Sequence, residues 1–186
     1  LMPTPADAKT FSISDCQTPS RRKLFERTAE AIHKTDPVFT PPFPGSIAKF
    51  LAPDSTFNRR HGTVTAFIAE RDGRPIGRIA AIVNRSHNAY HQDRTGFFGF
   101  FECVNEPAVA RALFEKASAV LRAAGLETIR GPYNPSINDD CGVLMNGFDK
   151  PTMIGLPWNP DYYLHLNARI LSYAEATGCD TLMTVC

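Results

Sequence analysis

Two strand-like segments joined by an Asp-Gly turn constrain the fold of this chain more than any other feature. Residues 63–70 (T-V-T-A-F-I-A-E) and residues 75–84 (P-I-G-R-I-A-A-I-V-N) are rich in β-branched and apolar side chains. Between them, Asp72-Gly73 supplies the positive φ angles that a tight hairpin turn requires. A third apolar segment, Gly96–Val104, follows a polar stretch over residues 85–94 that we predict to be a loop. Three consecutive strands predict an antiparallel meander.

Helical patterns lie on both sides of this meander in the sequence. Apolar residues recur every three or four positions over Pro107–Ala124, and proline is favoured at the first position of a helix. An earlier helix is predicted over Arg21–Lys34 with Ser20 as its cap, and a last one between about residues 159 and 177. With a short fourth strand over Glu127–Gly131, this order predicts a mixed α/β fold. Its mostly antiparallel central sheet is flanked by helices.

The composition restricts the class of function. The chain has 186 residues, of which 43% are hydrophobic and 21% are charged, as is typical of one globular domain with a substantial core. The formal net charge is +1 with acids and bases interspersed, so we predict neither nucleic acid nor an anionic membrane as a partner. No apolar run approaches the roughly 18 residues of a membrane span. The N-terminal segment lacks the pattern of a secretory signal.

The side chains that usually bind metals are scattered. The five cysteines stand far apart with no Cys-x-x-Cys pair, so neither a disulfide framework nor a zinc site is predicted. Isolated thiols fit a reducing compartment, and we expect a cytoplasmic protein. His87 and His91 have the spacing of a metal-binding pair on a helix, but no third ligand stands near them. We therefore predict no metal.

Several longer motifs point to a known family. The strands A-F-I-A-E-R-D-G-R-P-I-G-R-I-A-A-I and the helix A-L-F-E-K-A-S-A-V-L-R-A-A-G resemble the central hairpin and main helix of GNAT-type N-acyltransferases. The segments G-F-F-G-F-F-E, G-P-Y-N-P-S-I-N-D-D-C-G-V-L-M-N-G-F-D and L-P-W-N-P-D-Y-Y resemble a poorly characterised bacterial branch of that superfamily. The resemblance covers about residues 50–166. It implies the GNAT fold, acetyl-CoA or another acyl-CoA as donor, and a small-molecule amine as acceptor.

The resemblance also implies a donor site. In the superfamily, acyl-CoA sits where two central strands splay apart, and N–H groups at the start of the main helix hold its pyrophosphate. Of the expected Q/R-x-x-G-x-G/A signature only the last position is matched here, Pro107 has no N–H, and Glu106 adds a negative charge. A second hypothesis is therefore a non-catalytic GNAT-like module that binds a small molecule or a partner chain. The residues that the resemblance assigns to acyl-CoA are Cys103, Val104, Asn105, Ala108, Val109 and Ala110.

Two residues are candidates for proton transfer. Glu102 ends the third strand, where many GNAT enzymes have a general base that takes a proton from the amine, directly or through water. The alternative is an exposed carboxylate paired with an arginine. The family often has a tyrosine on the last helix that protonates the leaving thiolate. Tyr162 and Tyr163 point about 100° apart on a helix, and we favour Tyr163. The alternative is one core and one surface tyrosine.

Polar residues in the long segment after the fourth strand are candidates for the acceptor pocket. Asn134 and Asn138 lie among prolines and glycines, where they could bind the amine. They are equally typical of turns, because asparagine side chains bond their own backbone there. The sequence leaves both interpretations open.

The two ends of the chain differ from the middle. Residues 1–20 are predicted to be a flexible arm or an edge segment, and residues 21–166 to be the GNAT-like domain. Residues 167–186 resemble a fragment of the cysteine-rich domain of heterodisulfide-reductase-like subunits, so we expect a foreign or truncated helix–strand tail. That tail would leave the GNAT-like fold incomplete at its C-terminus, or add a strand to its sheet. A third hypothesis, a redox or iron–sulfur fragment without a complete cluster, rests on Cys179 and Cys186.

Overall fold

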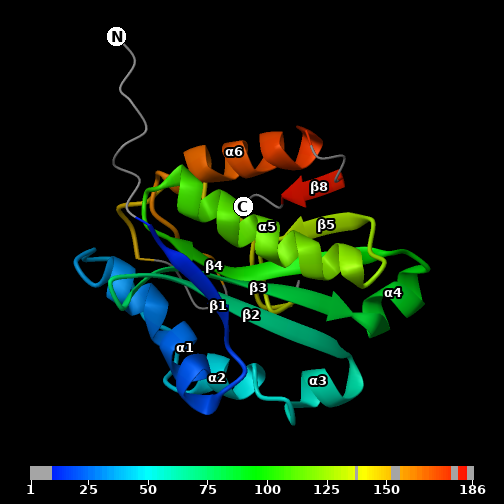
Figure 1. The fold of residues 1–186 in the computed structure, drawn as a ribbon. Coiled ribbons are helices and arrows are strands. Elements are labelled where there is room, and N and C mark those ends of the chain that lie inside the picture. The colour runs from blue at the N-terminus through cyan, green and yellow to red at the C-terminus, as the bar shows by residue number, and fades with distance from the viewer. Residues whose placement is uncertain (1–9, 137, 152–155, 177–179, 184–186) are drawn as a thin grey trace.

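A six-stranded sheet forms the centre of the described structure. The computed structural model describes residues 10–136, 138–151, 156–176 and 180–183. The strands stand in the order β1-β2-β3-β4-β5-β8, in which β1 to β4 are antiparallel and β5 and β8 run parallel to β4 (Figure 1). Their bounds are β1 (Ser12–Asp15), β2 (Gly62–Arg71), β3 (Arg74–Asn84), β4 (Thr95–Cys103), β5 (Thr128–Gly131) and β8 (Asp180–Met183). The mixed α/β fold with a mostly antiparallel sheet is therefore confirmed.

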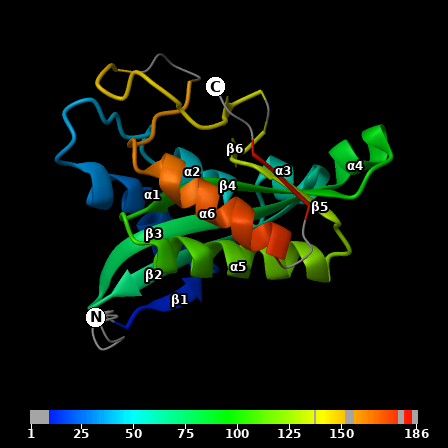
Figure 2. The ribbon, with the colours of Figure 1, turned by 90° about the horizontal axis from the view of Figure 1, so that it is seen from above.

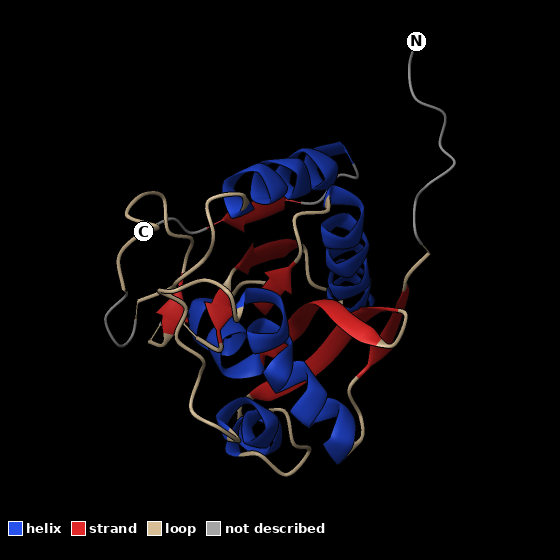
Figure 3. Ribbon diagram, turned by 90° about the vertical axis from the view of Figure 1, so that its left-hand side faces the viewer, coloured by secondary structure: helices blue, strands red, loops and turns tan. Residues whose placement is uncertain are grey.

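Helices cover both faces of this sheet (Figures 2 and 3). One face of the sheet packs against α1 and α2 through a core that includes Phe25, Ile68 and Phe97. The other packs against α5 and α6 through a core that includes Phe98 and Leu113. The helices are α1 (Pro19–His33), α2 (Ser46–Phe50), α3 (Thr56–Arg60), α4 (Arg85–His91), α5 (Pro107–Ala123) and α6 (Tyr163–Ala176).

Local sequence explains the central hairpin and the main helix. Asp72 and Gly73 adopt φ angles of 51° and 71°, as a tight turn between β2 and β3 requires. Helix α5 begins at Pro107 and ends before Gly125, which adopts a φ of 77°. The N–H of Leu126 then returns to the carbonyl of Leu121, which closes the C-terminus of the helix.

A β-bulge in β4 sets which side chains face each core. Arg78 pairs with Glu102 and Ala80 pairs with Gly99, so β4 holds one extra residue between these pairs. Phe100 lies in the bulge with a φ of 51°. As a result, Phe97 and Phe100 share the face of α1 and α2, whereas strict alternation would place them on opposite faces.

Two local predictions were wrong. Residues 85–94 do not form only a loop, because α4 begins at Arg85 and the side chain of Asn84 caps it by accepting the N–H of His87. The helix has no buried residue and so no apolar stripe to reveal it. Ser20 does not cap α1, because the helix already begins at Pro19 and Ser20 lies inside it. The cap is Thr18, whose side-chain oxygen accepts the N–H of Arg21 at 3.3 Å.

The segments predicted to differ from the domain join its sheet. β1 lies inside residues 1–20 and pairs with Phe67–Glu70 at the sheet edge, which matches an edge segment there. Helix α6 crosses the predicted boundary between residues 166 and 167. Strand β8 follows in the tail and pairs with β5, as the added-strand alternative expected.

Candidate active site

Strands β4 and β5 separate after a short parallel contact. They pair only over Thr95–Phe97 and Thr128–Arg130, while β4 continues to Cys103. Beyond that point, residues from later in the chain cover the edge of β4. A two-stranded ribbon of β6 (Tyr133–Asn134) and β7 (Asp140–Cys141) lies against one part, and the start of α6 lies against the other. The predicted splay of two central strands stays a prediction, because the residues that follow β5 remain close to β4, where Asn134 accepts the N–H of Phe100.

The start of α6 provides two tyrosines to the end of β4. The hydroxyl of Tyr162 donates to the carbonyl of Cys103 at 2.8 Å, and the hydroxyl of Tyr163 accepts the N–H of Cys103 at 2.8 Å. Tyr163 is buried, and its O–H also donates to Glu102 Oε2 at 2.8 Å. The two residues that the sequence suggested for proton transfer are therefore in direct contact.

Glu102 is the centre of a buried polar cluster formed by four elements. His33, the last residue of α1, places Nε2 at 2.8 Å from Oε2 of Glu102. Arg78 of β3 places one guanidinium nitrogen 3.4 Å from Oε1 and donates through the other to the carbonyls of Phe25 and Glu26. The side chain of Glu102 is 15% exposed and that of Arg78 is 4% exposed. The carboxylate therefore accepts from three donors in a largely buried setting.

The surroundings set the protonation states of this cluster. Burial would raise the pKa of Glu102, but the hydrogen bond from His33 and the charge of Arg78 together hold it below its ordinary value. Burial and the nearby Glu102 charge raise the pKa of Tyr163 well above its ordinary value. At neutral pH the pair is thus an ionised carboxylate bonded to a protonated phenol, which is able to donate a proton.

Aromatic rings enclose the histidine of the cluster. The His33 ring lies 5.6 Å from Phe39, 5.1 Å from Trp158 and 6.2 Å from Tyr163, measured between ring centroids. Phe39 and Trp158 touch each other as well, at 5.2 Å. The indole Nε1 of Trp158 is buried and makes no hydrogen bond to any residue that the structure describes. It is a donor that a bound molecule could use.

The residues assigned to acyl-CoA lie around the start of α5. Cys103, Val109 and Ala110 have fully buried side chains, while Asn105 and Ala108 are exposed. The N–H groups of Val109 and Ala110 bond to the carbonyl of Glu106. In the first turn of α5, the N–H of Ala108 makes no hydrogen bond to any described residue. A phosphate would find fewer free donors here than at an ordinary helix N-terminus.

The negative charge at this helix start is paired. Arg71 binds the carboxylate of Glu106 with two parallel hydrogen bonds of 2.8 and 2.7 Å. The repulsion that Glu106 would exert on a phosphate is thereby reduced. The start of α5 fits an acyl-CoA pyrophosphate only in part, and the binding role of these residues stays a prediction.

The two asparagines suggested for the acceptor pocket form their hydrogen bonds with residues outside the Glu102 cluster. The side-chain oxygen of Asn134 accepts the N–H of Phe100 in the β4 bulge. Asn138 is exposed, and its N–H donates to the hydroxyl of Ser136. The contact of Asn138 is of the local kind expected in turns, whereas that of Asn134 joins β6 to β4; substrate binding by either residue stays a prediction.

Sequence reasoning missed three members of the cluster. His33 lies near the end of a predicted helix and in no motif, whereas Arg78 and Trp158 lie inside family-like segments that gave no reason to single them out. A buried arginine in a strand of apolar residues was the one available signal, because such a charge requires a partner.

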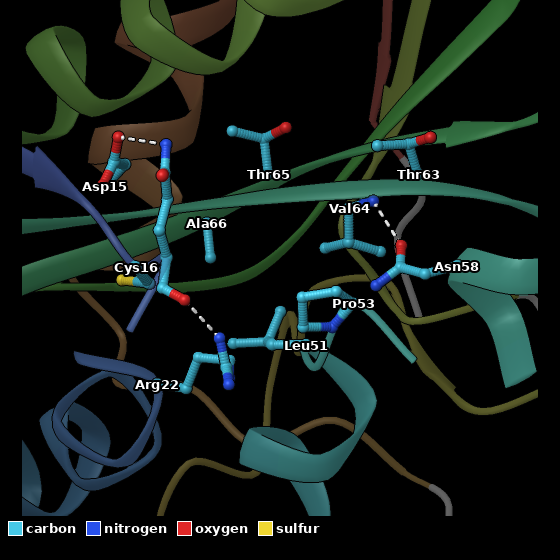
Figure 4. A pocket seen from close by; sticks show the side chains of 11 residues that line it. Asp15, Cys16, Arg22, Leu51, Pro53, Asn58, Thr63, Val64, Thr65 and Ala66 are labelled. Atoms are coloured by element: carbon cyan, nitrogen blue, oxygen red, sulfur yellow. Dashed lines mark hydrogen bonds between the residues drawn. The ribbon is translucent and has the colours of Figure 1, made fainter. Parts of the chain in front are cut away.

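A separate cavity of about 520 Å³ lies at the other edge of the sheet, where β1 ends and β2 continues. Figure 4 shows Cys16, Arg22, Leu51 and Asn58 around it, with Asn58 accepting the N–H of Val64 at 3.0 Å. It shares no lining residue with the Glu102 cluster. We place the candidate site at Glu102, because the cavity holds no comparable set of converging polar groups.

Neither a metal-binding cluster nor a membrane-spanning helix is found among the described residues. No three His, Cys, Asp or Glu side chains within them are arranged to hold a metal ion. No helix among them is both long and apolar enough to cross a membrane. Cys179 and Cys186, on which the iron–sulfur hypothesis rests, lie outside the described residues.

Comparison with known proteins supports the fold and identifies relatives. No protein-family model matches the chain. It is 32% identical over 162 residues to the bacterial ceramide synthase of Caulobacter vibrioides (strain NA1000 / CB15N), which covers 87% of this chain and 42% of that protein. It is 30% identical over 141 residues to protein YghO of Escherichia coli (strain K12), covering 76% and 36%. The chain thus spans about two fifths of the length of these curated relatives.

A solved structure has a similar fold. The tandem GNAT protein from the clavulanic acid biosynthesis pathway (without AcCoA) superposes with a TM-score of 0.54 over 87% of this chain and 43% of that chain, at 12% identity. At that identity the likeness concerns the fold alone. These comparisons give no support to the resemblance of the tail to heterodisulfide-reductase-like subunits. The described chain has the fold of the GNAT acetyltransferases.

Proposed function

We propose that this chain carries the catalytic centre of an N-acyltransferase that moves an acyl group from acyl-CoA to an amine. The observation that carries the proposal is the contact between Tyr163 and Glu102 at the end of β4, within a GNAT fold. A protonated phenol and an ionised carboxylate in contact provide a proton donor and a proton acceptor at one point. The contact lies at the end of β4, beyond the short pairing of that strand with β5, and the resemblance places the acyl donor between these two strands.

The acceptor that we propose is a long-chain amino alcohol. One relative is a bacterial ceramide synthase, and a ceramide is the amide of an acyl chain with such an amine. Large apolar side chains are exposed in the two segments that provide Phe39 and Trp158 to the site: Phe43 is 80% exposed, Met145 46% and Leu156 52%. Exposed apolar groups of this kind favour contact with an apolar molecule.

The chemistry follows from the protonation states. The Glu102 cluster takes the proton from the substrate ammonium. The neutral amine then attacks the carbonyl carbon of the thioester. The C–N bond forms, the C–S bond breaks, and the O–H of Tyr163 protonates the leaving thiolate. The attacking nitrogen then gives its second proton to the Tyr163 oxygen, which restores the phenol and leaves the neutral amide. Because the pKa of Tyr163 is raised, its proton is retained until the thiolate needs it.

The experiment measures amide formation by mass spectrometry, with acyl-CoA donors of increasing chain length and primary amines that include long-chain amino alcohols. Tyr163→Phe is expected to lower turnover by about 10²-fold or more, the usual contribution of a positioned acid. Tyr162→Phe is the matched control, because that hydroxyl also bonds Cys103 but does not touch Glu102. Equal losses in the two variants, or no amide with any donor, would oppose the proposal.

A second candidate is a non-catalytic GNAT-like module. It is favoured by the start of α5, where Pro107, Glu106 and the bonded N–H groups leave few donors for a pyrophosphate. It is also favoured by Asn134, whose side-chain oxygen already accepts the N–H of Phe100 on β4. Calorimetric titration with acetyl-CoA, with CoA as control, separates the candidates. A folded chain that binds neither at millimolar concentration would support the module.

A further inference from the structure

We infer that His33 takes the proton from the acceptor amine at its Nδ1 atom, and that Glu102 acts through His33 as a positioning residue. The inference rests on the proposed N-acyltransferase function and changes which atom of the cluster serves as the base. Its grounds are the bonding of Glu102, the tautomer that this bonding imposes on His33, and the apolar enclosure of the imidazole ring.

The bonding of Glu102 makes it a poor base. Oε2 accepts from His33 and from Tyr163 at 2.8 Å each, and Oε1 lies 3.4 Å from Arg78. A carboxylate that must give up one of these donors to receive a proton loses the stabilisation of its charge.

The same bonding fixes the tautomer of His33. An ionised carboxylate can only accept a hydrogen bond, so the contact between Nε2 and Oε2 requires the proton on Nε2. In the neutral ring, Nδ1 then carries the lone pair. Nδ1 makes no hydrogen bond to any residue that the structure describes, because both recorded bonds of this ring are at Nε2. A carboxylate that holds an imidazole by one nitrogen and leaves the other as base is a recurrent catalytic arrangement.

The surroundings of His33 favour this role. The charged and titratable groups that face it are Glu102 from β4 and Tyr163 from α6, with Arg78 from β3 behind Glu102. The remaining walls are the rings of Phe39 and Trp158, which carry no charge. These rings form an apolar wall beside the imidazole and add no charge that would compete for its proton.

The protons balance as follows. The ammonium of the acceptor loses one proton to Nδ1 of His33, and its nitrogen then forms the bond to the thioester carbonyl carbon. When the C–S bond breaks, Tyr163 gives its proton to the thiolate. The second proton of the attacking nitrogen passes to the Tyr163 oxygen, which restores the phenol. His33 releases its proton to solvent when the product leaves.

The kinetic test compares three variants as a function of pH. His33→Gln is expected to lower kcat by about 10²-fold or more and to abolish the rise of activity with pH that marks loss of a proton from the base. Added imidazole should restore part of the activity of His33→Ala. Glu102→Gln should lower kcat but keep a pH-dependent rise. His91→Gln, which changes an exposed histidine on α4, is the control and should match the unchanged protein.

The opposite pattern would overturn the inference. If Glu102 itself is the base, Glu102→Gln abolishes the pH-dependent rise and His33→Gln retains it, and imidazole rescues neither.

A second measurement does not depend on activity. Nitrogen-15 NMR of the histidine side chains in the unchanged protein should show neutral His33 protonated at Nε2, with a shift toward the Nδ1-protonated form in Glu102→Gln. His33 protonated at Nδ1 in the unchanged protein would refute the inference even if acyl transfer is observed. The expected tautomer without acyl transfer would instead leave the arrangement intact and count against the proposed function.

Discussion

Replacing Glu102 with glutamine should destabilise the fold strongly, because it leaves the buried charge of Arg78 without its counter-charge. Arg78 is 3% exposed, and its guanidinium lies 3.4 Å from Oε1 of Glu102. At an effective dielectric constant of about 20, two unit charges at that separation attract by roughly 5 kcal/mol, an upper bound. Breaking buried pairs by removing one partner typically costs about 3–5 kcal/mol. We expect a loss of about 3 kcal/mol in the free energy of unfolding.

The pairwise term is obtained from a double-mutant cycle. Arg78→Met and Glu102→Gln, alone and together, should show a coupling of about 2 kcal/mol, because the double variant no longer buries an unpaired cation. Urea unfolding followed by far-UV circular dichroism and by the fluorescence of Trp158, the single tryptophan, gives each free energy. This residue contacts His33, so its emission reports on the site itself.

A more exposed ion pair provides the control. Arg21 and Glu70 lie 2.7 Å apart with side chains that are 27% and 19% exposed. The corresponding cycle with Arg21→Met and Glu70→Gln should give a coupling below about 1 kcal/mol, as surface pairs do. A coupling at Arg78 and Glu102 no larger than this control would show that the buried pair is not what stabilises the cluster.

Three further predictions concern stability. The pKa of Glu102 in the folded protein is below its ordinary value of 4.5, so as pH falls the unfolded chain binds a proton at Glu102 before the folded chain does. The free energy of unfolding should therefore fall as pH drops below about 4.5 toward the folded-state pKa. Urea titrations at several pH values check this, and Glu102→Gln should flatten the slope; an equally steep slope in the variant would contradict the assignment. In Gly99→Ala the added Cβ would lie 1.6 Å from the carbonyl oxygen of Tyr133, so the free energy of unfolding should fall by about 2–3 kcal/mol, as measured by thermal unfolding. An unchanged melting temperature would be incompatible with that contact. Thr18→Ala should cost about 1 kcal/mol through loss of the α1 cap, while Ser20→Ala should cost less, and the reverse order would restore Ser20 as the cap.

Much of the fold could be predicted because its signals are local. The turn at Asp72-Gly73 and the limits of α5 at Pro107 and Gly125 depend on backbone preferences of those residues and their neighbours. Helix α4 escaped prediction since it is held by a cap from Asn84 and not by an apolar stripe. The bulge at Phe100 escaped it because strand register depends on the partner strand.

The candidate site divides in the same way. Glu102 and Tyr163 could be named from family-like motifs, and their catalytic roles remain predictions. His33 lies in no motif, and the hairpin motif that contains Arg78 assigns it no role. They stand 69 and 24 positions from Glu102.

By itself, the sequence determined the succession of strands and helices and the ends of several of them, since these follow from interactions among near neighbours. Only the tertiary structure decided that four elements bring a carboxylate, a phenol, an imidazole and a guanidinium into one buried cluster. The reason is physical: a charge removed from water must be matched by whichever polar groups the packed elements bring within hydrogen-bonding distance, and that depends on packing in space, not on order along the chain.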